Sequence, residues 1–305
     1  MAAIQSTGKA FSENREMKTL PGEKKRKAGK IASVTGIYAL LILLSLFFLF
    51  PFIVMVSLSF LSDKEIQLQV LFSPSGTLYL GAYAGIFSSG SKYMKYLANT
   101  LTVAAITTVG IPFVSSVCAY GFAKMEFKGK EFVFGVVLST MMIPAVITIV
   151  PLYTIYAKLG WINTLYPMWV PALFGGGATN IFLMRQFMRG IPNDMLKAAE
   201  LDGANSFVVY TRIMVPLCKP ILLYVAVMSF MGAWNDFMTP FTYLDYGSDS
   251  ITLALGIYYD YGPGSTKLAN EAMAAGNVMV LPCAILFFCF QKYLIDGVAV
   301  TGMKD

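Results

Sequence analysis

Long apolar runs, separated by short polar segments, are the dominant pattern of this chain. A helix crosses the roughly 30 Å hydrocarbon core of a membrane with about 20 apolar residues. Six stretches reach or approach that length, and we predict transmembrane helices at roughly 36–60, 97–123, 132–157, 168–188, 220–241 and 273–291. The pattern therefore predicts an all-α integral membrane protein.

Small and weakly polar residues set the later spans apart from the first. The last five contain Gly, Pro, Ser and Thr, which suits helices that face other helices or a pathway. Prolines are expected to kink four of the spans, at Pro51, Pro112, Pro144 and Pro171. The first span is too long for a cleaved signal peptide and has no small-residue cleavage site after it, so we interpret it as a retained helix.

Basic residues are distributed unequally between the two sides of these spans. Of the 23 Lys and Arg residues, 18 lie in the segments 1–35, 124–131, 185–219 and 292–305. Basic residues mark the cytoplasmic side, so we predict that both termini are cytoplasmic. The basic run at 24–27 lies beside the first span, where an orientation signal that contacts anionic lipid is favoured over a nucleic-acid site.

The predicted domain organisation follows from this alternation. A basic tail at 1–35 precedes the first helix at 36–60, and an external loop at 61–96 follows it. The membrane core then occupies 97–291 and includes a polar segment at 190–219 and a second external segment at roughly 242–272. A cytoplasmic tail at 292–305 follows it.

Composition narrows the possible chemistry. Charged residues make up 13% of the chain and hydrophobic residues 56%, and there is no histidine. A soluble domain carries about 25% charged residues, and histidine is the commonest general base and metal ligand. The four cysteines form no CxxC pair, and the glycine-rich YGPGSTK at 261–267 lacks the spacing of a phosphate loop. We therefore predict no catalytic residues, no metal site and no nucleotide site in this chain.

The polar segment KAAELDGANSFVVYTRIMVP at 197–216 predicts two short helices. Pro192 and Asn193 can start the first helix, because proline fits the first turn and asparagine can cap it. Asp194 then lies near the positive end of the helix dipole. Gly203 can adopt the left-handed conformation that ends a helix. Asn205 or Ser206 can cap the second helix, which Pro216 is expected to stop.

Three interpretations of this segment differ in what it contacts. It could be an ordinary cytoplasmic connection, a DNA-reading helix-turn-helix, or a surface that binds a partner protein. Flanking membrane spans hold it against the bilayer, which disfavours DNA. A helix of small residues with charged flanks suits close docking against a protein.

The segment resembles the EAA loop of permease subunits in ABC importers. That pattern is EAA, three residues, Gly, nine residues, and then I-x-L-P. The chain matches it at Lys197-Ala198-Ala199, Gly203, Ile213 and Pro216, whereas Lys197 replaces the usual Glu and Val215 the usual Leu. The residues that the resemblance assigns to ATPase coupling are Lys197, Ala198, Ala199, Glu200, Asp202, Gly203, Ile213 and Pro216.

Further runs extend the resemblance over roughly 79–305, to carbohydrate permeases of the maltose-importer G-subunit type. These runs are YMKYLANTL (93–101), AYGFAKMEFKGKE (119–131), MMIPAVITIVPLY (141–153), LGWINT (159–164), FLMRQFMRGIP (182–192), WNDF (234–237) and FQKYLIDGV (290–298). Each is weak alone, but their shared order and spacing are specific.

The resemblance implies a type I ABC importer permease fold in a bacterial inner membrane. It implies that two permease subunits, here a paralogous heterodimer, form the pathway. Two ATPase subunits would hold ATP and Mg, an external sugar-binding protein would deliver the sugar, and this chain would bind no cofactor itself. The EAA loop would seat in a cleft of the ATPase.

Polar and aromatic residues at membrane depth are the candidates for contact with sugar. They are Asn99, Tyr153, Asn180, Trp234, Asn235, Asp236 and Asn277. Each could instead make a helix–helix hydrogen bond or belong to an interfacial aromatic belt. Asp236, near a span end, could bind sugar hydroxyls or reach interfacial water. The glycines 175–177 favour close helix packing or a bend over ligand binding.

Two other functions remain as alternatives. An ion-coupled secondary sugar transporter usually needs ionisable residues deep in the membrane, and none lies well inside the predicted spans. Sodium coupling through carbonyl groups is still compatible with the sequence. A membrane enzyme is disfavoured because no nucleophile or general-base constellation is visible.

Overall fold

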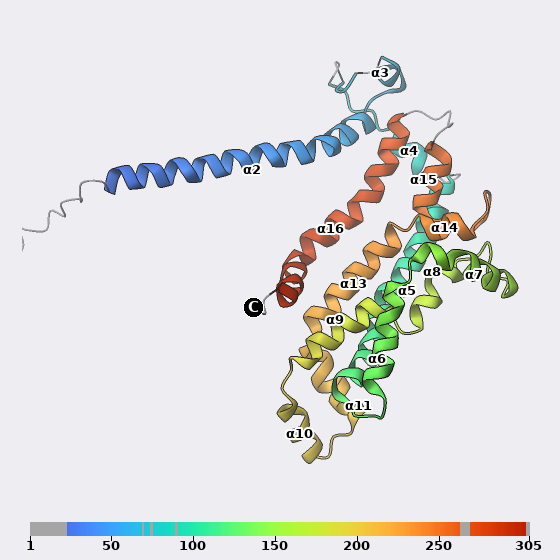
Figure 1. The fold of residues 1–305 in the computed structure, drawn as a ribbon. Helices are drawn as coiled ribbons and strands as arrows, with labels where there is room; N and C mark the ends of the chain where they lie inside the picture. Colours follow the sequence, from blue (N-terminus) through green and yellow to red (C-terminus); the bar gives the residue numbers. More distant parts are fainter. Residues whose placement is uncertain (1–22, 69, 74–75, 89–90, 263–268, 303–305) are drawn as a thin grey trace, which may run out of the picture. The chain divides into compact units, whose positions relative to one another are not determined.

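The computed structural model describes residues 23–68, 70–73, 76–88, 91–262 and 269–302. Within these residues the secondary structure is helical, and no strand is present. The chain forms two units, Met1–Val54 and Met55–Asp305 (Figure 1).

Helix α2 (Glu23–Ser59) accounts for the described part of the first unit and extends a few residues into the second. Its segment Ser33–Ser59 has a mean hydropathy of 2.9 and is long enough to cross a membrane. Pro51 lies inside this continuous helix. All but the last residue of the span predicted at 36–60 is thus part of a longer helix that begins in the basic tail.

Two more helices are long and apolar enough to cross a membrane unbroken. They are α5 (Lys92–Lys124) and the segment Ala269–Gln291 of α16 (Ala269–Gly302). Both include the stretch predicted from the apolar pattern and begin several residues earlier. Pro112 and Pro282 lie within these helices.

The helix predicted at 132–157 is interrupted. Helix α6 (Lys130–Ser139) and the turn η1 (Thr140–Met142) are followed by α7 (Ala145–Lys158), at an angle of 99°. Ile143 and Pro144 have extended backbones at the break. A proline disfavours the helical conformation of the residue before it, which explains the position of the break.

The stretch predicted at 168–188 is also divided. It contains α8 (Tyr166–Trp169), η2 (Pro171–Leu173) and α9 (Ala178–Arg189). Between η2 and α9, Gly175, Gly176 and Gly177 all have positive φ, at 93°, 72° and 88°. A Cβ on Gly176 would lie 2.8 Å from the carbonyl oxygen of Ile111, so this glycine also lets the chain approach α5 closely.

The remaining bent pair lies nearer the C-terminus. Helix α11 (Ser206–Val209), a π-helical turn labelled η3 (Tyr210–Met214) and α12 (Val215–Leu217) lead into α13 (Lys219–Trp234) across a 77° bend. The stretch predicted at 220–241 then breaks again before α14 (Met238–Tyr243). The described residues thus contain three long apolar helices, or up to five spans if each bent pair counts as one, so the predicted six are not confirmed.

Helix α5 is central to the second unit, where it packs against α9 and α13. One buried cluster lies toward its N-terminal end, with Tyr96, Trp234 and Leu253, and another toward its C-terminal end, with Tyr120, Met184 and Met214. Residues of α4 (Gly81–Ile86) and α15 (Leu253–Tyr261) belong to the first cluster, whereas α3 (Asp63–Gln67) contacts α16 and α14 contacts α7 and α8. Figure 1 shows α10 (Asn193–Leu201) and α11 at the opposite end of α5.

Candidate functional site

The first helix of the EAA-like segment, α10, starts differently from the prediction. Pro192 occupies the N-cap position, and no side chain caps the helix. Asn193 is instead the first helical residue, and its Oδ1 accepts a hydrogen bond of 2.7 Å from Lys124 Nζ. The expected Asn193 cap is therefore wrong, because a lysine of α5 occupies its acceptor.

Gly203 ends α10 in the predicted manner. Its φ is +88°, in the left-handed region that favours glycine. The N–H of Gly203 donates to Glu200 O at 3.0 Å, and the N–H of Ala204 donates to Ala199 O at 2.9 Å. This pair of bonds is the Schellman arrangement, which satisfies carbonyl groups at a helix end.

Asn205 begins the second helix of the segment. Its Oδ1 accepts the backbone N–H of Val208 at 2.9 Å, so Asn205 rather than Ser206 is the cap. Helical structure continues to Leu217, one residue beyond the predicted stop at Pro216, because a proline is tolerated in the first turn of α12.

Most of the predicted coupling residues lie on the surface. Lys197, Ala198, Glu200, Asp202, Gly203 and Pro216 are exposed, whereas Ala199 and Ile213 are partly buried. Four large apolar side chains that the motif did not single out are also exposed in Asn193–Leu217: Met195, Leu201 at 90%, Phe207 at 73% and Leu217. An apolar residue in a polar segment between spans is the sequence signal that could have identified them.

The opposite face of the segment is anchored to the membrane core. Leu196, Val209 and Met214 are buried in the cluster that includes Met184 and Met188 of α9. Burial of a side chain of this size contributes about 1.5–3 kcal/mol. The segment thus has one face packed on the core and one exposed face.

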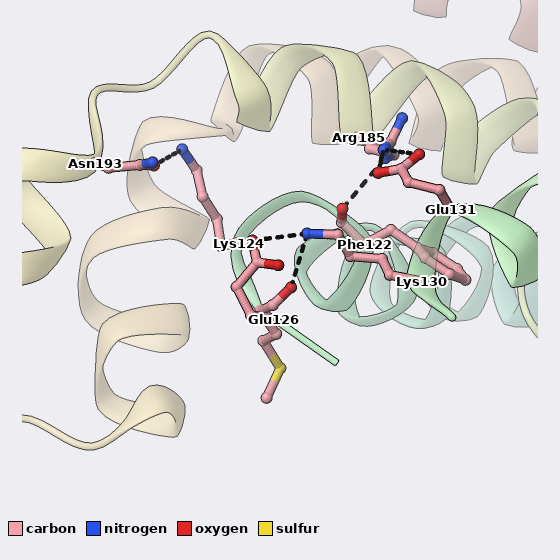
Figure 2. A network of polar contacts seen from close by, with 8 residues as sticks. Phe122, Lys124, Glu126, Lys130, Glu131, Arg185 and Asn193 are labelled. Carbon is pink, nitrogen blue, oxygen red and sulfur yellow. Dashed lines mark hydrogen bonds and ion pairs between the residues drawn. The ribbon is translucent and has the colours of Figure 1, made fainter. Parts of the chain in front are cut away.

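Charged side chains connect the helices next to the segment, as Figure 2 shows. Arg185 of α9 is buried, and its Nη2 lies 2.7 and 3.0 Å from the two carboxylate oxygens of Glu131 on α6. Its Nε donates to Phe122 O of α5 at 3.2 Å, and its guanidinium lies 3.9 Å from the centre of the Phe134 ring. Arg185 therefore joins three helices.

Two of the predicted pathway residues come together around one open hollow. This hollow has a volume of about 250 Å³, and its polar lining includes Thr107, Asn180, Ser229 and Asp236. Asn180 Nδ2 donates to Gly176 O at 2.7 Å, and Asp236 accepts the backbone N–H of Thr239 at 3.1 Å. Thr107 and Ser229 were not predicted, since weakly polar residues in apolar helices are too common to single out.

Two other predicted pathway residues make contacts between helices. The indole N–H of Trp234, which is 1% exposed, donates to Met279 O at 2.8 Å. Asn277 Nδ2 donates to Ser59 Oγ and Tyr83 Oη, both at 2.9 Å. These contacts match the alternative of a helix–helix hydrogen bond.

The last three predicted pathway residues lie away from the hollow's lining. Asn99 Nδ2 donates to the carbonyl oxygens of Asp249 and Ile251, both at 2.9 Å. Asn235 Nδ2 donates to Met231 O at 2.8 Å, and the ring of Tyr153 stacks on Tyr243. Beside Asn99, a hydrogen bond from Lys95 and its positive charge lower the pKa of Asp249.

Comparison with known proteins identifies the family. Residues 78–300 match the family model described as "Binding-protein-dependent transport system inner membrane component". The chain belongs to this family. The permease is 32% identical over 84% of its length to an arabinooligosaccharides transport system permease protein, AraQ, from Halalkalibacterium halodurans, and covers 91% of that protein. It is 28% identical over 86% of its length to a trehalose/maltose transport system permease protein, MalG, from Thermococcus litoralis, and covers 94% of it.

A solved structure supports the same fold. The permease aligns with a chain of a bacterial ABC transporter involved in the import of the acidic polysaccharide alginate, with a TM-score of 0.74 and 21% identity. The alignment covers 90% of the permease and 99% of that chain. The family and the relatives named above confirm the resemblance to carbohydrate permeases of the maltose-importer G-subunit type. The fold is that of a type I ABC importer permease.

Proposed function

We propose that this chain is the permease subunit of an ATP-driven carbohydrate importer and that Asn193–Leu217 docks on a partner ATPase. The family assignment supports a role as a membrane permease. The observation that carries the coupling role is the open face of this segment, where Leu201 and Phe207 are 90% and 73% exposed. Burial of each would contribute about 1.5–3 kcal/mol to an interface.

The class of substrate comes from the relatives and from the hollow. Relatives that are 32% and 28% identical to this chain are named for arabinooligosaccharide and trehalose/maltose transport. Asp236 and Asn180 supply oxygen acceptors at the hollow, where sugar hydroxyls could donate. A carboxylate at this place favours a neutral sugar over an anionic one, because like charges repel.

The implied assembly has four kinds of component. A second permease subunit completes the pathway, two ATPase subunits hold ATP and Mg, and an external binding protein delivers the sugar. One structural neighbour was solved together with a periplasmic protein that carries an alginate pentasaccharide, which supports this last component by analogy. The open face of Asn193–Leu217 is the surface of this chain assigned to the ATPase.

The contacts of α5 support the proposed orientation. Its C-terminal residue Lys124 contacts Ile191 and Asn193, and both segments were predicted to be cytoplasmic. Near its other end, Asn99 contacts Asp249 and Ile251, in a segment predicted to be external. Predicted inner and outer segments thus meet opposite ends of one helix, in agreement with cytoplasmic termini.

The test compares one exposed leucine of the docking face with one elsewhere. Leu201→Glu places a charge on the proposed interface, whereas Leu68→Glu changes a residue that is 73% exposed in the segment predicted to be external. We expect Leu201→Glu to reduce co-purification of the ATPase and ATP-dependent uptake in vesicles, and Leu68→Glu to retain co-purification. Equal co-purification with both variants would contradict docking through this face. Uptake driven by an ion gradient without ATP would refute the importer class.

A further inference from the structure

One face of α5 contacts both helices of Asn193–Leu217, the proposed docking segment. Ser116, Tyr120 and Lys124 are spaced four residues apart, and residues at this spacing share a face of a helix. Ser116 Oγ lies 2.6 Å from Tyr210 Oη, in a contact that is buried on both sides. The rings of Tyr120 and Tyr210 pack with centroids 5.3 Å apart. These contacts attach α5 to the second helix of the segment.

Lys124 attaches α5 to the start of the first helix. Its Nζ donates to Ile191 O at 2.6 Å and to Asn193 Oδ1 at 2.7 Å, and Figure 2 shows the contact with Asn193. Hydrogen bonds from an ammonium group are stronger than those between neutral groups. A shift of α10 must therefore either move α5 with it or break two charge-assisted hydrogen bonds.

The other end of α5 holds a segment that was predicted to be external. Thr100 Oγ1 accepts the backbone N–H of Leu253 at 2.7 Å, and both residues are fully buried. Asn99 donates to the carbonyl oxygens of Asp249 and Ile251. At about 1.5 Å per residue, Asn99 and Lys124 are roughly 40 Å apart along one uninterrupted helix.

We infer that α5 transmits displacement of the docking segment to the segment Asp249–Leu253. Lys124, at the C-terminal end of α5, is the positioning residue for this coupling. The inference rests on the proposed function, since it needs an ATPase that moves the docking segment. Rigid secondary elements held by buried contacts at both ends can transmit displacement over this distance. Lys124 acts by holding Ile191 and Asn193, without contact with sugar or nucleotide.

The experiment measures sugar transported per ATP hydrolysed in the reconstituted importer. Lys124→Met removes the ammonium and preserves most of the side-chain volume, whereas Lys124→Arg retains the charge and the donors. Lys128→Met makes the same change at an exposed lysine four residues further on. We expect Lys124→Met to lower the transport-to-hydrolysis ratio about fivefold or more, the lower end of a typical coupling between sites. Lys124→Arg should restore most of it, and Lys128→Met should leave it unchanged.

A second variant separates positioning from assembly. Asn193→Ala removes one acceptor of Lys124 on the surface and leaves the membrane core intact. In a double-mutant cycle, residues that act through one contact give non-additive effects. We therefore expect Asn193→Ala to lower the same ratio, with little further loss when it is combined with Lys124→Met. If the Lys124→Met chain does not assemble into the importer, the transport-to-hydrolysis ratio of Asn193→Ala alone tests the inference.

The results that would overturn the inference differ from those against the proposed function. A wild-type ratio in Lys124→Met or in Asn193→Ala, or fully additive effects, would show that α5 does not carry the displacement through Lys124. Equal losses in Lys124→Met and Lys128→Met would show a general effect of surface charge. The proposed function fails separately, if the wild-type complex shows no sugar-dependent ATP hydrolysis.

Discussion

Replacement of Gly203 by valine tests the backbone geometry on which docking is proposed to depend. The φ of +88° at this position is strained for any residue with a Cβ, and more so for a β-branched one. A Cβ at Gly203 would meet no atom within 4 Å, so the Cβ itself adds no clash with neighbouring residues. The cost that follows from the structure is backbone strain, about 1–3 kcal/mol.

That strain is relieved only if the end of α10 changes. A shift of φ out of the left-handed region disrupts the hydrogen bonds that Gly203 and Ala204 donate to Glu200 and Ala199. If the docked state requires the geometry seen here, the whole strain free energy is lost from the binding free energy of the ATPase. At about 1.4 kcal/mol per tenfold change in affinity, Gly203→Val should weaken ATPase binding roughly 5- to 150-fold.

The assay is the affinity of detergent-purified permease complex for its ATPase, together with uptake after reconstitution. Gly203→Asn is the matched control, because asparagine tolerates the left-handed conformation far better than valine does. Lys197→Glu restores the commoner family residue and should be much milder than Gly203→Val. Wild-type affinity and uptake in Gly203→Val would show that the geometry at Gly203 does not govern docking.

Three further predictions concern other parts of the molecule. Arg185→Ala should destabilise the chain by about 2–4 kcal/mol, measured by thermal unfolding in detergent, because the cation–π contact and the charged hydrogen bonds are lost; an unchanged midpoint would contradict this. Asp236→Asn keeps an acceptor for Thr239 and should lower sugar uptake about tenfold or more with ATPase binding intact; unaltered uptake would remove Asp236 from the pathway. A single cysteine at position 128 should be labelled only from the cytoplasm and one at position 246 only from outside, and the opposite result would invert the topology.

Local features of this fold were predictable from sequence. Residues 36–59 of the apolar run lie within one helix because its side chains are apolar all round. Gly203 has the expected positive φ. The signal for a left-handed residue at a helix end lies in the few residues around it, so it can be recognised from the local sequence. Asn205 acts as a cap for the same reason.

Features that depend on distant contacts were not predictable. Hydropathy does not distinguish a continuous helix from two bent ones. A kink at Pro144 was expected, but its size of 99° was not, and the break between α13 and α14 inside the span predicted at 220–241 was missed. The partner of Trp234 is a backbone carbonyl 45 residues away, and nothing in its local sequence indicates whether an indole faces sugar or a neighbouring helix. Lys124 was counted only as a basic residue, although its two hydrogen bonds reach the start of α10.

The short length of α13 has a consequence for the membrane that surrounds it. Sixteen residues at about 1.5 Å each extend roughly 24 Å, which is less than the roughly 30 Å of an average hydrocarbon core. Such a mismatch is accommodated by local thinning of the bilayer, by flanking side chains that reach the interface or by contacts with other subunits, at a cost of fractions of a kcal/mol per Å. Lipids with shorter acyl chains match the length of α13 better. The acyl-chain length of the bilayer therefore influences how easily the two ends of α13 move relative to the lipid headgroups.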